Sequence, residues 1–140
     1  MSTSEIKIGL MATLVGPYAA MGEDGTRGTL LALEEIDNHV AGKNIVLVEE
    51  PTNATPDSAV MAAESLLDGH GADIIIGPLS GNEGLAIRDF AKTRPNHTFI
   101  NGIAGGQDMT LRSPAPNFFS FSTNGVQWMA GLSEYVLEQG

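Results

Sequence analysis

The chain has 140 residues, which favours one domain that buries roughly two-thirds of its unfolded surface. Its formal net charge is −10 with 7 Lys and Arg residues, so charge repulsion argues against nucleic acid and anionic membranes as partners. The absence of cysteine excludes disulfides, thiolate catalysis and cysteine-ligated metals, and no apolar run approaches the roughly 18 residues of a membrane span.

The chain starts without a signal peptide, and we expect that a targeting segment has been removed before Met1-Ser2-Thr3-Ser4. An apolar run predicts a strand over 6–12, and 15–18 break it. Helical spacing predicts a helix over 22–38. Its expected inner face carries Leu30, Leu33, Ile36 and Val40. Three glycines in its first turns indicate either close packing on the sheet or room for a ligand, and these are Gly22, Gly25 and Gly28.

A second strand is predicted over 45–48, ended by the polar residues 49–53. Thr55 and Pro56 are typical of a helix N-cap and first helical position. The buried stripe expected for that helix consists of Ala59, Val60, Ala63, Leu66 and Leu67.

The third strand is predicted over 74–76, where three isoleucines precede a Gly-Pro pair and a small, polar turn. Asn82 and Glu83 are typical of the N-cap and first turn of the next helix. The residues expected to face inward are Leu85, Ala86, Phe90 and Ala91. Those expected to face outward are Arg88, Asp89 and Lys92.

A fourth strand is predicted over 98–100, followed by a loop of small residues over 101–107. A fifth strand is predicted over 118–122, and Asn124 is expected to cap a final helix. The apolar residues of that helix are Val126, Met129, Leu132 and Val136.

This alternation predicts an α/β fold: a doubly wound, five-stranded parallel sheet in the flavodoxin-like order 2-1-3-4-5, within a three-layer αβα sandwich. Residues 1–140 are expected to form a single domain, because no repeat, low-complexity segment or linker interrupts the pattern.

Motifs for catalysis are missing. The sequence has neither G-x-G-x-x-G after the first strand nor G-x-x-x-x-G-K-[ST], and residues 77–81 read G-x-x-S-G rather than the G-x-S-x-G of a nucleophile elbow. No histidine is placed to activate Ser80 or spaced to bind a metal; the three are His39, His70 and His97. We therefore expect no enzyme, no cofactor and no metal site.

Loops of small residues at the carboxyl edge of the sheet favour a binding site instead. Backbone N–H donors and a helix N-terminus can hold a carboxylate there without a charged side chain. The apolar wall of such a pocket is expected from Leu79, Ile103, Met21 and Tyr18.

Several of these stretches also resemble a known family. They are Ile6-Lys7-Ile8-Gly9, Gly16-Pro17-Tyr18-Ala19-Ala20-Met21-Gly22, Ile75-Ile76-Gly77-Pro78-Leu79-Ser80-Gly81 and Asn117-Phe118-Phe119. In this order they resemble the type I periplasmic binding proteins of ABC transporters, and more narrowly the branched-chain amino acid (leucine/isoleucine/valine-binding) receptors.

The resemblance implies that the chain is the N-terminal lobe alone of a two-lobed periplasmic receptor. The implied partners are a second lobe, a membrane permease and a small-molecule ligand. In the family, a segment returning from the second lobe completes the first lobe. Without that segment, an uncovered apolar surface and self-association as a homo-oligomer are expected.

The resemblance also implies site residues, carried over by position. They are Met21, Leu79, Ser80, Gly81, Asn82, Ile103, Ala104 and Gly105. Where the amino acid receptors commonly have a serine and a threonine, this chain has Gly81 and Gly105, so two hydroxyl partners of an α-amino acid are missing. Another small carboxylate, such as an aromatic or aliphatic acid, is the resulting hypothesis.

The leading interpretation is thus a ligand-binding lobe for a small carboxylate, which binds weakly as an isolated half. One alternative is a flavodoxin-like enzyme or signalling domain. A second is a folded fragment that only self-associates.

Overall fold

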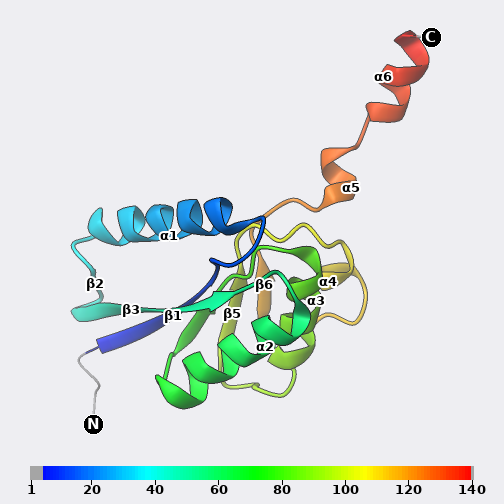
Figure 1. The fold of residues 1–140 in the computed structure, drawn as a ribbon. Helices are drawn as coiled ribbons and strands as arrows, with labels where there is room; N and C mark the ends of the chain where they lie inside the picture. Colours follow the sequence, from blue (N-terminus) through cyan, green and yellow to red (C-terminus); the bar gives the residue numbers. More distant parts are fainter. Residues whose placement is uncertain (1–4, 140) are drawn as a thin grey trace.

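A six-stranded sheet forms the centre of the computed structural model, which describes residues 5–139 (Figure 1). The strands are β1 Glu5–Thr13, β2 His39–Val40, β3 Lys43–Thr52, β4 Ile74–Ile76, β5 Thr98–Asn101 and β6 Phe118–Ser120. They lie in the order β2-β3-β1-β4-β5-β6, and every neighbouring pair except β2 and β3 is parallel. The predicted order of the five parallel strands is therefore confirmed, with one further strand at the edge.

The additional strand β2 pairs antiparallel with the start of β3 through a tight turn. The sequence pattern predicts these two residues at the end of the first helix, but Asp37 and Asn38 have φ values of 52° and 51°, which end helical geometry there. β3 is also longer than the predicted 45–48. Its Pro51 is tolerated because β2 reaches only Asn44, which leaves the outer edge of β3 free at the proline.

The helices are α1 Ala19–Glu34, α2 Pro56–Glu64, α3 Gly81–Ala91, α4 Asp108–Leu111, α5 Gly125–Trp128 and α6 Leu132–Gln139. A π-helical turn over Ser65–Gly69 extends α2. Thr55 and Asn124 cap α2 and α5 as predicted. The predicted final helix is instead two helices, because Gly131 between them has a φ of +85°.

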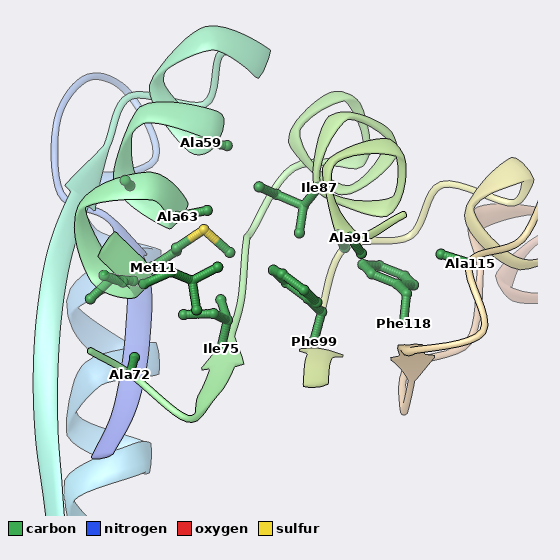
Figure 2. Packing of buried hydrophobic residues seen from close by; sticks show 14 of the residues in the cluster. Met11, Ala59, Ala63, Ala72, Ile75, Ile87, Ala91, Phe99, Ala115 and Phe118 are labelled. Atoms are coloured by element: carbon green, nitrogen blue, oxygen red, sulfur yellow. The ribbon is translucent and has the colours of Figure 1, made fainter. Parts of the chain in front are cut away.

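The main core lies between the sheet and the helices α2 and α3 (Figure 2). Ile75, Phe99 and Phe118 are neighbours across three strands and point to this face. They meet Leu66 from the π-helical turn and Ile87 from α3, all of them buried. The alternating strand pattern and the helix stripes thus bury one continuous apolar cluster.

The opposite face of the sheet is covered only in part, by α1, while α5 and α6 extend away from the body of the molecule (Figure 1). Leu33 is buried under α1, but Leu30 is 51 % exposed and Ile36 and Val40 are each 45 % exposed. The prediction that these three residues face the core is wrong. No described element packs beyond α1 on this face, so the side chains have nothing to be buried against.

Candidate functional site

Three loops of small residues meet at the carboxyl edge of the sheet, where the sequence predicts a site. The loop after β4 contacts the loop after β5, since a Cβ at Gly81 would lie 3.4 Å from the nitrogen of Gly106. The loop after β6 joins them, because the Gly125 N–H donates to the Gly105 carbonyl at 2.9 Å. Parallel strands place their carboxyl ends together, and glycines allow the backbones to approach this closely.

The first of these loops leads into α3 through a capping box. Ser80 is the N-cap, with its hydroxyl accepting from the Glu83 N–H at 3.3 Å and its own N–H donating to the Glu83 carboxylate at 3.0 Å. The prediction of Asn82 as N-cap is wrong, since Ser80 has the extended backbone and the hydroxyl two positions earlier. The N–H groups of Gly81 and Asn82 find no partner among residues 5–139 and remain available to a ligand.

The carboxylate of Glu83 is fully buried at this helix end, and one of its oxygens has no hydrogen-bond partner within the described chain. This carboxyl group occupies the first turn of α3 and already accepts the Ser80 N–H. An anion would therefore be held here by directional N–H donors more than by net charge.

The loop after β5 is fixed by a buried asparagine. Asn101 accepts from the Ala104 N–H and donates to the Ala104 carbonyl, both at 2.8 Å. Ala104 is buried and its N–H is engaged, so it supports the loop rather than offering a donor. Ile103 projects to the surface, and Gly105 is covered by the ring of Trp128.

An apolar pocket of about 470 Å³ lies next to these loops, between the first half of α1 and the ends of β1 and β4. It is lined by three of the predicted residues, Met21, Leu79 and Ile103. The remaining predicted residues do not line it; they are Tyr18, Ser80, Gly81, Asn82, Ala104 and Gly105. The candidate site therefore combines an apolar pocket with a neighbouring ridge of backbone amides.

The sequence does not single out the rest of this lining. It comes from Leu10 to Thr13 at the end of β1 and from α1 residues such as Thr26 and Thr29. The glycines of α1 are the one sequence signal for it, since they left both close packing and room for a ligand open, and Gly22 and Gly25 line the pocket. A Cβ at Gly22 would lie 1.9 Å from the Thr13 carbonyl oxygen, whereas one at Gly25 would meet nothing within 4 Å. Close packing explains the first glycine, and open space beside the pocket surrounds the second.

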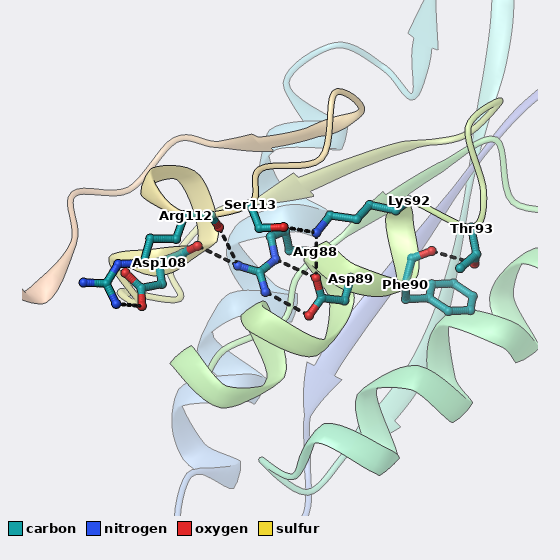
Figure 3. Close-up of polar contacts among 8 residues, drawn as sticks. All are labelled: Arg88, Asp89, Phe90, Lys92, Thr93, Asp108, Arg112 and Ser113. Carbon is teal, nitrogen blue, oxygen red and sulfur yellow. Dashed lines mark hydrogen bonds and ion pairs between the residues drawn. The ribbon is translucent and has the colours of Figure 1, made fainter.

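Arg88 is a further residue whose position the pattern misjudges. It is buried, 8 % exposed, and donates to the carbonyls of Asp108 and Arg112 at 2.7 and 2.9 Å (Figure 3). Its hydrogen bonds to Asp89, with a further one from Lys92, lower the pKa of Asp89 to about 2. Arg88 thus ties α4, which follows the loop after β5, to α3.

Among residues 5–139 we find no group of three or more His, Asp or Glu side chains that could hold a metal ion. Within the same residues, no helix has the length and apolarity needed to cross a membrane.

Comparison with known proteins defines the class. A family model described as "Periplasmic binding protein" matches residues 5–140, and the chain belongs to this family. It is 31% identical over 88 residues to the Leu/Ile/Val-binding protein BraC3 of Rhizobium johnstonii, which covers 61% of this chain and 24% of the relative.

Solved structures agree with the fold and the family. An ABC transporter substrate-binding protein from Sphaerobacter thermophilus is 29% identical with a TM-score of 0.85, covering 96% of this chain and 36% of that one. A solute-binding protein of an R. palustris ABC transporter, in complex with benzoate, is 26% identical with a TM-score of 0.87. The match covers 97% of this chain and 38% of that one.

The chain thus spans only 24% to 38% of the length of these three proteins. Its relatives are substrate-binding proteins of ABC transporters and not enzymes, which confirms the expectation that the chain is not an enzyme.

Proposed function

We propose that residues 1–140 form the ligand-binding N-terminal lobe of an ABC-transporter substrate-binding protein that takes a small carboxylate. The observation that carries the proposal is the pair of unpartnered N–H groups of Gly81 and Asn82 beside an apolar pocket. Such donors suit a carboxylate, and Met21, Leu79 and Ile103 suit an apolar body attached to it. The match to one lobe of longer receptors supports the domain assignment.

The ligand class follows from the residues at the loops. Among the described residues that line the pocket, Asp24 alone carries a formal charge, and it is paired with Arg27. Within residues 5–139 no cationic side chain lines the pocket to bind an anion, so the amides have that role. The R. palustris relative binds benzoate, and the BraC3 relative is named for leucine, isoleucine and valine. Glycine at 81 and 105 favours an acid without an α-amino group.

Binding by this lobe alone is weak in this proposal. A facing lobe supplies further contacts and excludes water from the hydrogen bonds, and both contributions are lost in the isolated half. We expect a dissociation constant on the order of 1 mM. A second lobe, a permease and a periplasmic location complete the proposal for the longer protein.

The isolated lobe also self-associates in this proposal, because apolar side chains are exposed at the last strand and on the last two helices. They include Phe119 of β6, Phe121 after it, Val126 of α5, and Leu132, Val136 and Leu137 of α6. Sedimentation equilibrium over a hundredfold range of concentration would show the association. A monomer throughout would contradict this part.

The amide donors can be tested by removing one of them without a side-chain change at the pocket. Gly81 is the first residue of α3, where proline is favoured, and Ser80 before it already has φ −87° and ψ 152°, the region that a following proline requires. Gly81→Pro removes the N–H, and Gly81→Ala keeps it with a Cβ in ordinary contact distance.

We expect Gly81→Pro to weaken sodium benzoate binding by at least about tenfold, since a hydrogen bond to a charged group is lost. Gly81→Ala should bind like the unmodified chain. Dissociation constants come from NMR titration at constant ionic strength, and circular dichroism verifies that both variants are folded. Equal affinities of the proline and alanine variants would contradict the proposal.

A further inference from the structure

Trp128, the last residue of α5, is the single tryptophan of the chain and lies directly on the candidate ligand loop. A Cβ at Gly105 would lie 2.9 Å from Cη2 and 3.1 Å from Cζ3 of its indole ring. α5 is itself joined to this loop by the hydrogen bond from the Gly125 N–H to the Gly105 carbonyl. The ring therefore occupies the space that a side chain at position 105 would take.

The ring is also held in place. Its Nε1–H donates to the Thr123 hydroxyl, and the capping box between Asn124 and Gln127 fixes the helix that carries it. Even so, Trp128 is 58 % exposed. A large, oriented, solvent-exposed aromatic surface beside a binding loop is typical of a recognition element, because its π face is available without a rearrangement.

We propose that Trp128 is a specificity-determining residue, whose indole face makes the site prefer aromatic carboxylates to saturated ones of the same size. The inference rests on the proposed function, and it names the ligand class of that same site. Ile103, two residues before Gly105, lines the apolar pocket, so the ring and the pocket border one loop. An aromatic acid held near this loop can stack on the indole, whereas a saturated ring makes only apolar contact.

The test compares benzoate with cyclohexanecarboxylate, which has the same charge and ring size but no π face. We expect the unmodified chain to bind benzoate about threefold to tenfold more tightly. Trp128→Leu should lose this preference, because leucine keeps an apolar contact but has no π face. Trp128→Phe should keep most of the preference. Tyr135→Leu is the matched control, since Tyr135 is an exposed aromatic residue of α6.

Because Trp128 is the only tryptophan, its fluorescence provides a second readout that needs no variant. The fluorescence should change in a saturable way with benzoate, and the fitted dissociation constant should equal the one obtained by NMR. The change should also exceed the quenching that benzoate causes in free N-acetyltryptophanamide. Binding of both acids with equal affinity by the unmodified chain, or fluorescence unchanged at saturation, would overturn the role of Trp128 and leave the proposed function intact. Failure of the folded chain to bind any carboxylate would overturn both.

Discussion

The contact between α1 and β1 depends on one glycine. At Gly22 the helix touches the backbone of Thr13 so closely that no side chain fits, while Gly25, one turn later, faces open space. Since both glycines lower helix propensity by the same amount, only packing distinguishes them. The position of α1 over the pocket is therefore set at Gly22.

We expect Gly22→Ala to lower the free energy of unfolding by at least about 2 kcal/mol, because a methyl group placed 1.9 Å from a backbone oxygen forces the helix to shift. Gly25→Ala, the matched control, should raise it by up to about 1 kcal/mol through helix propensity. Urea denaturation measures both. Similar effects of the two substitutions would contradict the packing described here.

A pH dependence follows from the charge cluster on α3. The pKa of Asp89 falls from 3.8 to about 2, first because of the hydrogen bond from Arg88 and then because of Lys92. A carboxyl whose pKa is lower in the folded state stabilises the protein above its unfolded pKa. That contribution is lost as the pH falls from about 4 to about 2.

Asp89→Asn should therefore be less stable at pH 7 by no more than about 1 kcal/mol, since the side chain is 58 % exposed and solvent screens the pair. The difference should shrink as the pH falls from about 4 and be small by about pH 2, and high salt should reduce it at pH 7. Denaturant midpoints across this pH range provide the measurement. A difference that persists unchanged at pH 2 would rule out this explanation.

At the scale of elements, the strand order and the main core follow from the sequence, because apolar runs and helix stripes are local patterns. Arg88 could not be placed in this way. Its partners are carbonyls 20 and 24 residues further on, in and after a helix of four residues that has no periodicity to detect. Leu30 and Ile36 look like core residues but are exposed, since burial requires an element to cover them.

In the candidate site, too, some features follow from the sequence and others do not. The meeting of the loops follows from the parallel topology, so the neighbourhood of Gly81 and Gly105 was predictable. The lining contributed by β1 and α1 was not, because it depends on the space left between a helix and a sheet. Trp128 could not be placed either, because the sequence pattern predicts one continuous helix there. In the structure Gly131 divides that helix in two, and Trp128 ends the first part.

The last helix contributes little to stability in this structure. α6 has no buried residue, and its apolar side chains point into solvent. At a protein concentration where the chain is monomeric, ending it at Gly131 should change the melting temperature by less than about 3 °C, equivalent to less than about 1 kcal/mol. Leu66→Ala is the positive control and should cost about 2 to 5 kcal/mol, since that side chain is fully buried. A large loss of stability on removing α6 would show that the helix packs on the lobe in solution.

At the scale of the whole molecule, the chain has one well-packed face and one open face. The helices α2 and α3 complete the first, whereas α1 covers only part of the second (Figure 1). The candidate site lies at the edge where both faces end. This arrangement agrees with the proposal that the chain is one lobe of a longer receptor.

The central claim is that main-chain amides at the start of α3 hold the carboxylate. The most direct test is a ¹H–¹⁵N NMR titration of the chain with sodium benzoate at constant ionic strength. We predict that the amides of Gly81 and Asn82 shift most, together with Ile103, and saturate with a single dissociation constant on the order of 1 mM. Saturable shifts confined to the opposite, amino edge of the sheet, or no shifts at all, would contradict the account.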